Sequence, residues 1–267
     1  MLDSFYVREG DGFASTELTR GPWDPGAQHA GPPAALLARE FERIGDGRIG
    51  GPDGPAAQVG RITYEIVGSV PIGPLRVEAE VVRPGRRVEM VAGTLSGEDG
   101  KPLIRAQGWR LRRGEVEFDT PPGIPGPMPG PERGRQRDFF DTGQEHGYHT
   151  AMEYRFISGT FLEPGPAQVW LRMKHPLVAG EEPSPLQRVI VAADAGNGVS
   201  SPLDWRRYLF INVDLSVHLH RMPDGEWIGM DAVTVPERTG IGLSDTALHD
   251  ERGRIGRAAQ TLLVDER

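Results

Sequence analysis

The segment SPLQRVIVAADAGN, residues 184–197, predicts a helix that starts sharply and buries one face. Ser184 is a favourable N-cap residue, and Pro185 suits the first helical position. Two glycines, Gly196 and Gly198, are expected to end the helix. The apolar stripe at the i, i+3, i+4, i+7 spacing consists of Leu186, Val189, Ile190 and Ala193.

Asp194 lies in the last turn of this predicted helix, among small apolar neighbours. A carboxylate near a helix C-terminus opposes the helix dipole and costs roughly a few tenths of a kcal/mol. An aspartate kept at such a position is a candidate functional group. The alternative is an ordinary solvated aspartate at a helix end. The rest of the sequence is needed to distinguish the functional interpretation from the solvated one.

The composition excludes several classes of protein. The chain has 267 residues, of which 37% are hydrophobic, so it can bury one large core or two small ones. Its net charge of −8 and its pI near 5.4 argue against a nucleic-acid partner, which would require a basic stripe. The absence of cysteine excludes disulfides, thiol nucleophiles and cysteine metal sites. Because there is neither an apolar run of about 18 residues nor a signal-peptide pattern, we expect a cytoplasmic protein without a membrane span.

Two strand-rich regions flank a segment rich in proline and glycine. Residues 1–113 contain a hairpin, a helix near residues 33–44 and four strand-like runs. Residues 114–147 include PPGIPGPMPGPERGRQ, which fits neither a β-ladder nor a helix interior. We therefore predict a linker that is poorly ordered or extended over the surface. Residues 148–267 repeat the first pattern around the 184–197 helix, so the predicted units are 1–113 and 148–267.

The two regions match each other at a nearly constant spacing. The segment EDGKPLIRAQGW matches ERGRIGRAAQTL and aligns Gln107 with Gln260, where 260 − 107 = 153. The segment RITYEIVGS matches FINVDLSVH and aligns Thr63 with Asn212, where 212 − 63 = 149. The two helices start 185 − 33 = 152 residues apart. A repeated helix with a long antiparallel sheet predicts an α+β double hotdog, in which each curved sheet wraps one apolar helix and the sheets join edge to edge.

The second half resembles the C-terminal half of bacterial acyl-CoA thioesterase II and its relatives. In that family a helix-borne Asp, a Thr or Ser on the next strand and a Gln on the last strand orient a water. The matching residues here are Asp194, Asn212 and Gln260, so an amide replaces the family's usual hydroxyl. The resemblance implies a fatty acyl-CoA thioesterase of lipid metabolism that uses neither a cofactor nor a metal. Its other matches are the strand residues Asp214, Ser216, His218 and His220 and the segment HAGPPAALLARE at the start of the first helix.

This chemistry requires a base, a held water and donors for an oxyanion. Asp194 would act as the general base, while Asn212 and Gln260 would position the water by neutral hydrogen bonds. A helix N-terminus can supply backbone N–H groups to the oxyanion. His29 and Gly31 are the candidates at the first helix, because the two prolines that follow lack an N–H. The resemblance implies antiparallel helices, which would bring this N-terminus to the end of the second helix.

Other functions stay open at this point. A hotdog enoyl-thioester hydratase would need an Asp and a His close together, and no His follows Asp194 within the next twenty residues. A non-catalytic acyl-binding protein is compatible with Asn212. Asp214, His218 and His220 alternate on one strand and could hold a metal, although solvated histidines are the more common outcome. Acyl-chain length and oligomeric state are not predicted, but pairing through hotdog sheet edges makes a homo-oligomer an option.

Overall fold

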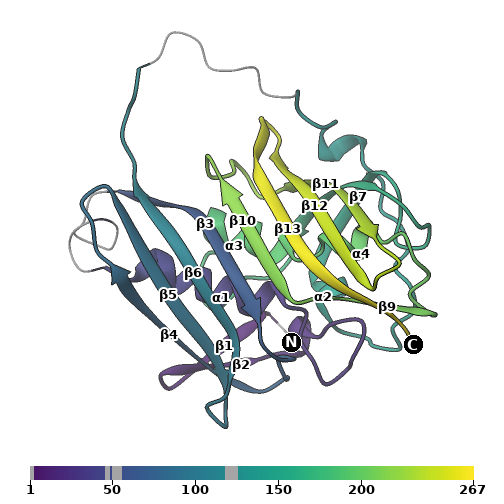
Figure 1. The fold of residues 1–267 in the computed structure, drawn as a ribbon, viewed down its shortest axis with the longest axis horizontal. Coiled ribbons are helices and arrows are strands. Elements are labelled where there is room, and N and C mark those ends of the chain that lie inside the picture. Colours follow the sequence, from purple (N-terminus) through teal and green to yellow (C-terminus); the bar gives the residue numbers. More distant parts are fainter. Residues whose placement is uncertain (1–2, 46–48, 50–55, 118–125) are drawn as a thin grey trace.

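The computed structural model describes residues 3–45, 49, 56–117 and 126–267. These residues form one 13-stranded antiparallel sheet that curves around two central helices (Figure 1). The strands are β1 (Tyr6–Glu9), β2 (Gly12–Ser15), β3 (Ala57–Ile66), β4 (Pro74–Arg83), β5 (Val88–Gly97), β6 (Pro102–Arg112), β7 (Met152–Ser158), β8 (Ala167–Met173), β9 (Tyr208–Asn212), β10 (Asp214–Leu219), β11 (Ile228–Pro236), β12 (Ile241–Asp250) and β13 (Gly253–Glu266). Their order is β1-β2-β4-β5-β6-β3-β10-β13-β12-β11-β8-β7, and β9 pairs with β13.

The helices lie against the concave side of the sheet and pack on each other. They are α1 (Gly31–Arg43), α2 (Tyr148–Ala151), α3 (Pro185–Ala193) and α4 (Gly196–Val199), with short 3-10 turns at Glu17–Thr19 and Pro131–Arg133. Ser184 caps α3, because its Oγ accepts a hydrogen bond from the backbone N–H of Gln187 at 3.1 Å. The prediction that Gly196 stops the helix is wrong, since a new helical turn begins at this residue after Asp194 and Ala195.

Each half of the chain forms one hotdog unit, and the double-hotdog prediction is confirmed. Strands β3 to β6 pack on α1, whereas α3 packs on β8 and β11 and α4 packs on β11 to β13 (Figure 1). The two sheets join edge to edge where β3 pairs with β10 in antiparallel register. Thr63 lies opposite Ser216 at this junction, and 216 − 63 = 153. These two residues are therefore equivalents in the repeat that meet each other at the seam.

The strand register corrects the alignment of Thr63 with Asn212. Asn212 pairs with Leu262, and Val59 pairs with Arg110. The two pairs are separated by the repeat spacing, since Asn212 follows Val59 by 212 − 59 = 153 residues and Leu262 follows Arg110 by 262 − 110 = 152. The equivalent of Asn212 in the first unit is therefore Val59. The sequence alignment was displaced by four residues. Because side chains alternate between the two faces of a strand, an even displacement keeps each side chain on the same face and preserves the apolar pattern. The break between β9 and β10 likewise corresponds to the irregular pairing of β3 between Val59 and Arg61.

The alignment of Gln107 with Gln260 is displaced by one residue. Gln107 pairs with Thr63 on the outer face and is exposed, whereas Gln260 points inward and is only 2% exposed. A shift of one residue moves a strand side chain to the opposite face of the sheet. Gly108 is the residue that corresponds to Gln260, at 260 − 108 = 152.

The predicted linker is described in part, because residues 118–125 lie outside the described residues. Residues 126–147 pack on the second unit, as Figure 1 shows. Met128 is buried in a small cluster with Trp170 and Trp227, and the Trp170 indole N–H donates to the carbonyl of Pro129 at 2.7 Å. This part of the proline-rich segment thus contributes apolar burial to the second unit.

Both ends of the long sheet carry backbone contacts with other segments. At β1 the N–H of Tyr6 donates to the carbonyl of Leu177 at 2.9 Å. At β7 Phe156 exchanges two backbone hydrogen bonds with Arg135, at 2.8 and 2.9 Å. Homo-oligomerisation through sheet edges stays a prediction. Within the described ranges, no helix is long and apolar enough to cross a membrane.

Candidate active site

Three side chains from the second unit converge at the end of α3. Asp194 is the C-cap residue of this helix and is 5% exposed. Asn212 is the last residue of β9, and Gln260 lies on the inward face of β13. The Nδ2 of Asn212 donates to Asp194 Oδ1 at 2.9 Å, and the Nε2 of Gln260 donates to the same oxygen at 3.2 Å. The buried carboxylate is therefore held by two amides from the surrounding sheet.

Gln260 also fixes the backbone at the helix end. Its Nε2 donates to the carbonyl of Asp194 at 3.1 Å, and its Oε1 accepts from the N–H of Asn197 at 3.1 Å. Gly196 allows this approach, because a Cβ there would lie 2.7 Å from Thr246 Oγ1 and 3.1 Å from Gln260 Oε1. The glycine after Asp194 is thus needed for close packing against the sheet.

The first unit contributes His29 and Gly31 to the same site. Because α1 and α3 are antiparallel neighbours, the N-terminus of α1 meets the end of α3. The Nδ1 of His29 lies 3.0 Å from Asp194 Oδ2. The imidazole stacks on Tyr148 with a centroid distance of 3.7 Å, and the Tyr148 hydroxyl donates to the carbonyl of Val191 at 2.7 Å. Burial lowers the pKa of His29 below its usual value, and the nearby Asp194 opposes this effect.

One ring nitrogen of His29 faces two partners. Its Nδ1 lies 3.2 Å from the N–H of Gly31 as well as 3.0 Å from Asp194 Oδ2. A ring nitrogen either carries a proton or presents a lone pair, so it cannot donate to the carboxylate and accept from Gly31 together. When Nδ1–H donates to an ionised Asp194, the N–H of Gly31 is released. This N–H opens α1, and Pro32 and Pro33 provide none.

A cavity of about 380 Å³ opens onto this group. Asp194, Asn212 and His29 line it together with Trp23 and Phe210. Trp23 is 45% exposed although its ring lies 5.1 Å from that of Phe140 and 5.8 Å from that of Phe210. The remaining wall is largely apolar and includes Ile66, Val70, Ile211 and Val213. The reactive groups thus lie beside a mainly hydrophobic pocket with an aromatic rim.

The structure brings all five sequence-predicted site residues together, but not the metal candidates. Asp214, Ser216 and His218 point to the outer face of β10, and the carboxylate of Asp214 accepts the N–H of Thr261. Across the described residues, no three His, Asp or Glu side chains are arranged to hold a metal ion. Tyr148 and Trp23 were missed as site residues, because nothing in the local sequence indicates that they meet Asp194 across the two units.

A buried carboxylate next to two amides, an imidazole and a helix N-terminus has the groups needed to deprotonate a water and stabilise an oxyanion. A double-hotdog fold with this arrangement is compatible with a thioester hydrolase. The family model of the acyl-CoA thioesterase N-terminal domain matches residues 19–111, and that of the C-terminal domain matches residues 127–264. The chain therefore belongs to the acyl-CoA thioesterase family. A search of curated protein sequences found no significant match.

Solved structures with the same fold cover nearly the whole chain. A putative thioesterase II from Thermobifida fusca YX has a TM-score of 0.73 at 19% identity, covering 97% of this chain and 95% of its own. A conserved hot dog fold protein of unknown function from Alicyclobacillus acidocaldarius has a TM-score of 0.73 at 14% identity, with 97% and 95% covered. An acyl-CoA thioesterase II from Mycobacterium marinum has a TM-score of 0.61 at 15% identity, with 97% and 94% covered. At these low identities the similarity shows a shared fold and nothing further.

Proposed function

We propose that the protein hydrolyses fatty acyl-CoA thioesters to the free acid and CoA, with Asp194 as the general base for an attacking water. The observation that supports this most directly is the buried Asp194 carboxylate, which both units contact at the mouth of an apolar pocket. Since Cys is absent from the chain, a water is the simplest nucleophile. We extend the proposal to a role in cytoplasmic lipid metabolism.

The hydrogen bonds on Asp194 leave room for one water. A carboxylate offers about four lone-pair sites. Asn212 and Gln260 use two on Oδ1, and His29 uses one on Oδ2. The remaining site on Oδ2 is the place for the attacking water. The amide oxygen of Asn212 accepts no hydrogen bond from the described residues and can help to orient this water.

The N-terminus of α1 is the proposed oxyanion site. As the water attacks, the thioester oxygen becomes negative, and the Gly31 N–H lies beside His29 at the positive end of the helix dipole. Donation from His29 Nδ1–H to Asp194 frees this N–H for the substrate. His29 would then orient Asp194 and leave the Gly31 N–H free to donate, and Gly31 would contact the substrate through this N–H.

A second candidate function arises from the His29–Asp194 contact. The sequence after Asp194 lacks the nearby His that an enoyl-thioester hydratase needs, but the first unit supplies one at 3.0 Å from the carboxylate. A hydratase would add water across the double bond of crotonyl-CoA and leave the thioester intact. A thioesterase would release a free thiol from the same substrate.

Assays with saturated acyl-CoAs of increasing length and with crotonyl-CoA test these alternatives. Thiol release should rise above the uncatalysed rate for at least one saturated substrate. Loss of crotonyl absorbance without thiol release would instead identify a hydratase. Binding of acyl-CoA with neither reaction would favour the non-catalytic acyl-binding alternative and would contradict the proposal.

A further inference from the structure

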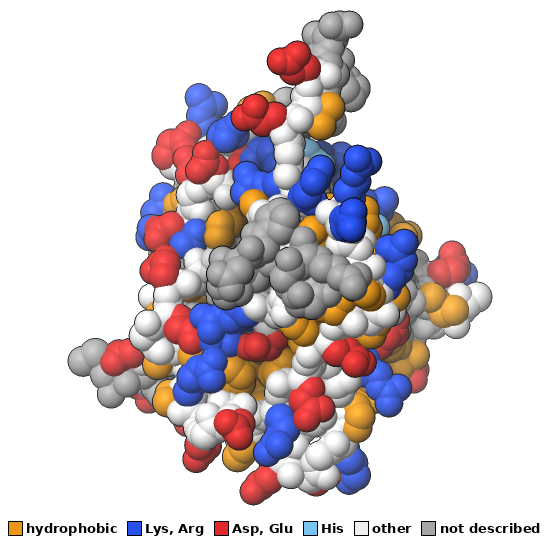
Figure 2. All heavy atoms as spheres, turned by 90° about the vertical axis from the view of Figure 1, so that its left-hand side faces the viewer, with side chains coloured by type: hydrophobic (Ala, Val, Ile, Leu, Met, Phe, Trp, Pro, Cys, Tyr) orange, Lys and Arg blue, Asp and Glu red, His pale blue; other side chains and the backbone are white. Residues whose placement is uncertain are grey.

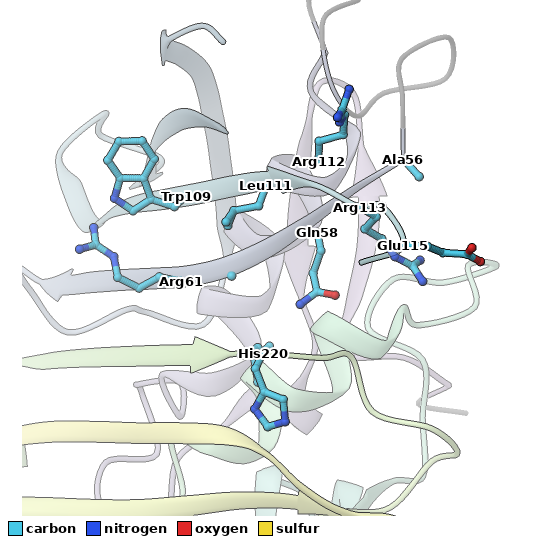
Figure 3. Close-up of a pocket in the computed structure, with 12 residues that line it drawn as sticks. Ala56, Gln58, Arg61, Trp109, Leu111, Arg112, Arg113, Glu115 and His220 are labelled. Atoms are coloured by element: carbon cyan, nitrogen blue, oxygen red, sulfur yellow. The ribbon is translucent and has the colours of Figure 1, made fainter. Parts of the chain in front are cut away.

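We propose that a second cavity, remote from Asp194, binds a nucleoside diphosphate group, the chemistry that ADP and CoA share. This surface, here called the arginine groove, crosses the first residues of β3, the end of β6 and the end of β10 (Figure 3). The proposal goes beyond the hydrolytic function and does not depend on it. The groove is defined by Gln58, Arg61, Trp109, Arg112, Arg113 and His220.

The duplication of the fold explains why a cavity lies there. Gln58 and Gly60 line the groove, and their equivalents Ile211 and Val213 line the catalytic pocket, at 211 − 58 = 153 and 213 − 60 = 153. Leu219 and Ile66 correspond in the same way, at 219 − 66 = 153. The groove is thus the counterpart of the catalytic pocket on the other side of the seam between β3 and β10.

The groove is the larger of the two cavities. Its volume is about 770 Å³, against about 380 Å³ for the catalytic pocket. Small-molecule sites commonly measure roughly 300–1,000 Å³. A nucleotide therefore fits the available space, whereas a single inorganic ion would leave most of it open.

The charge of the groove favours phosphate. Arg61, Arg112 and Arg113 line it, and none of them forms an ion pair with a carboxylate of the described residues. The Nε of Arg61 is buried and has no hydrogen-bond partner in the described structure. Glu115 is the acidic residue in the lining. Three unpaired guanidinium groups in a chain of net charge −8 concentrate positive charge at one place, and guanidinium groups match phosphate oxygens in a bidentate manner.

The arrangement of the side chains favours an extended ligand. Figure 3 shows Arg61 and Trp109 at one end of the groove and Arg113 near Glu115 at the other, with Gln58 between them. Arg61 pairs with Trp109, and Arg112 pairs with Ala57, so the two ends are four residues apart along β3. At roughly 3.3 Å per residue this spans about 13 Å. A nucleotide can place phosphates against one end and its base against the other, near the Trp109 ring, over which the Arg83 guanidinium also lies at 5.7 Å from the centroid.

Further charged groups lie near His220. Burial lowers its pKa, and Arg221 and Arg254 lower it further, whereas Asp250, the ion-pair partner of Arg221, opposes the decrease. The space-filling view in Figure 2 shows Lys and Arg side chains, with a histidine among them, gathered on this side of the molecule. Since like charges close together repel, a bound diphosphate would relieve this repulsion.

Isothermal titration calorimetry with pyrophosphate, ADP and CoA tests the proposal on the full chain. The test variant is Arg61→Gln, Arg112→Gln and Arg113→Gln together. The control variant, Arg76→Gln, Arg105→Gln and Arg238→Gln, removes the same charge from exposed positions that do not line the groove. ADP should bind the parent and the control alike and bind the test variant at least about tenfold more weakly, because the guanidinium groups that would contact its phosphates are lost. ADP affinity should also fall as salt is raised.

The three probes distinguish the ligands from one another. Binding of ADP and pyrophosphate would point to nucleotides in general, and a second CoA per chain that disappears only in the test variant would point to CoA. Equal weakening in both triple variants, or no binding of any probe to the parent at millimolar concentration, would overturn the proposal. Thermal unfolding of each variant confirms that the fold is intact. None of these binding measurements requires hydrolysis, so their result does not depend on whether the protein hydrolyses acyl-CoA.

Discussion

Asp194 and Glu42 occupy the same position in the two units, at the ends of α3 and α1, since 194 − 42 = 152. Their surroundings differ. The Glu42 carboxylate accepts hydrogen bonds from the Ser184 hydroxyl at 2.6 Å and from Gln187 Nε2 at 3.4 Å. Burial raises the pKa of Glu42, and these hydrogen bonds oppose the increase. Glu42 therefore holds Ser184, the N-cap residue of α3, whereas Asp194 faces a pocket.

The first prediction uses this pair as a matched comparison. Asp194→Asn should lower the hydrolysis rate by about 10²–10⁴-fold, because the base is lost while the shape is kept. Glu42→Gln should leave kcat within about a factor of two, because the equivalents of Asn212 and Gln260 there are Val59 and Gly108. Steady-state hydrolysis and acyl-CoA affinity should be measured for both variants. Equal activity of Asp194→Asn and the parent would reject Asp194 as the base.

A second prediction concerns the close contact of the two helices. A Cβ at Gly31 would lie 2.6 Å from the carbonyl oxygen of Val191. Gly31→Ala should therefore lower the free energy of unfolding by about 1–3 kcal/mol, as overpacking does, and should displace the proposed oxyanion donor. Gly198→Ala is the control, because nothing lies within 4 Å of its added Cβ and alanine suits a helix. Urea denaturation compares the two, and an undisturbed Gly31→Ala protein would contradict the packing argument.

The third prediction follows from the lowered pKa of His29. The folded state holds this imidazole neutral, since burial lowers its pKa below 6.5. Just below pH 6.5 the unfolded chain then binds more protons than the folded chain. The contribution of His29 to the free energy of unfolding is therefore fully present above pH 6.5 and decreases as the pH falls below it. His29→Asn should make the decrease shallower. His146→Asn, at a position whose side chain is 43% exposed, is the control for the loss of an imidazole elsewhere in the chain. Denaturation at pH 7.5, 6.5 and 5.5 measures these slopes, and identical slopes for both variants would refute the prediction.

The amino-acid sequence predicts the repeat and both helices, because these rest on local spacing, whereas the candidate site residues come from the resemblance to the thioesterase family. It does not predict the register between units. Moving Thr63 by four residues leaves the apolar pattern unchanged, so only the paired strands reveal this shift. Moving Gln107 by one residue changes its face, and the paired strands show which face each glutamine occupies. The contact of His29 with Asp194 joins residues 165 positions apart, since 194 − 29 = 165, and no local signal encodes it.

The arginine groove was missed for the same reason. Arg61 lies on β3, Arg112 is the last residue of β6 and is followed by Arg113, and His220 follows the end of β10. Arg112 and Arg113 stand beside Arg110 in the sequence, but Arg61 and His220 lie far from them along the chain, and the chain as a whole is acidic. Only the pairing of β3 with both neighbours brings them to one surface.

The last prediction tests the corrected register at the active site. Gln260→Glu replaces an amide that donates to Asp194 Oδ1 and to the Asp194 carbonyl with a second carboxylate. Two buried carboxylates at this distance repel each other, and one is expected to take up a proton. The loss of a donor to a charged group costs roughly 1.5–3 kcal/mol, so kcat should fall by about 10-fold or more and the protein should lose stability. Gln107→Glu makes the same chemical change on the exposed outer face and should alter neither quantity. If both substitutions lowered kcat equally, the inward orientation of Gln260 would not explain its role.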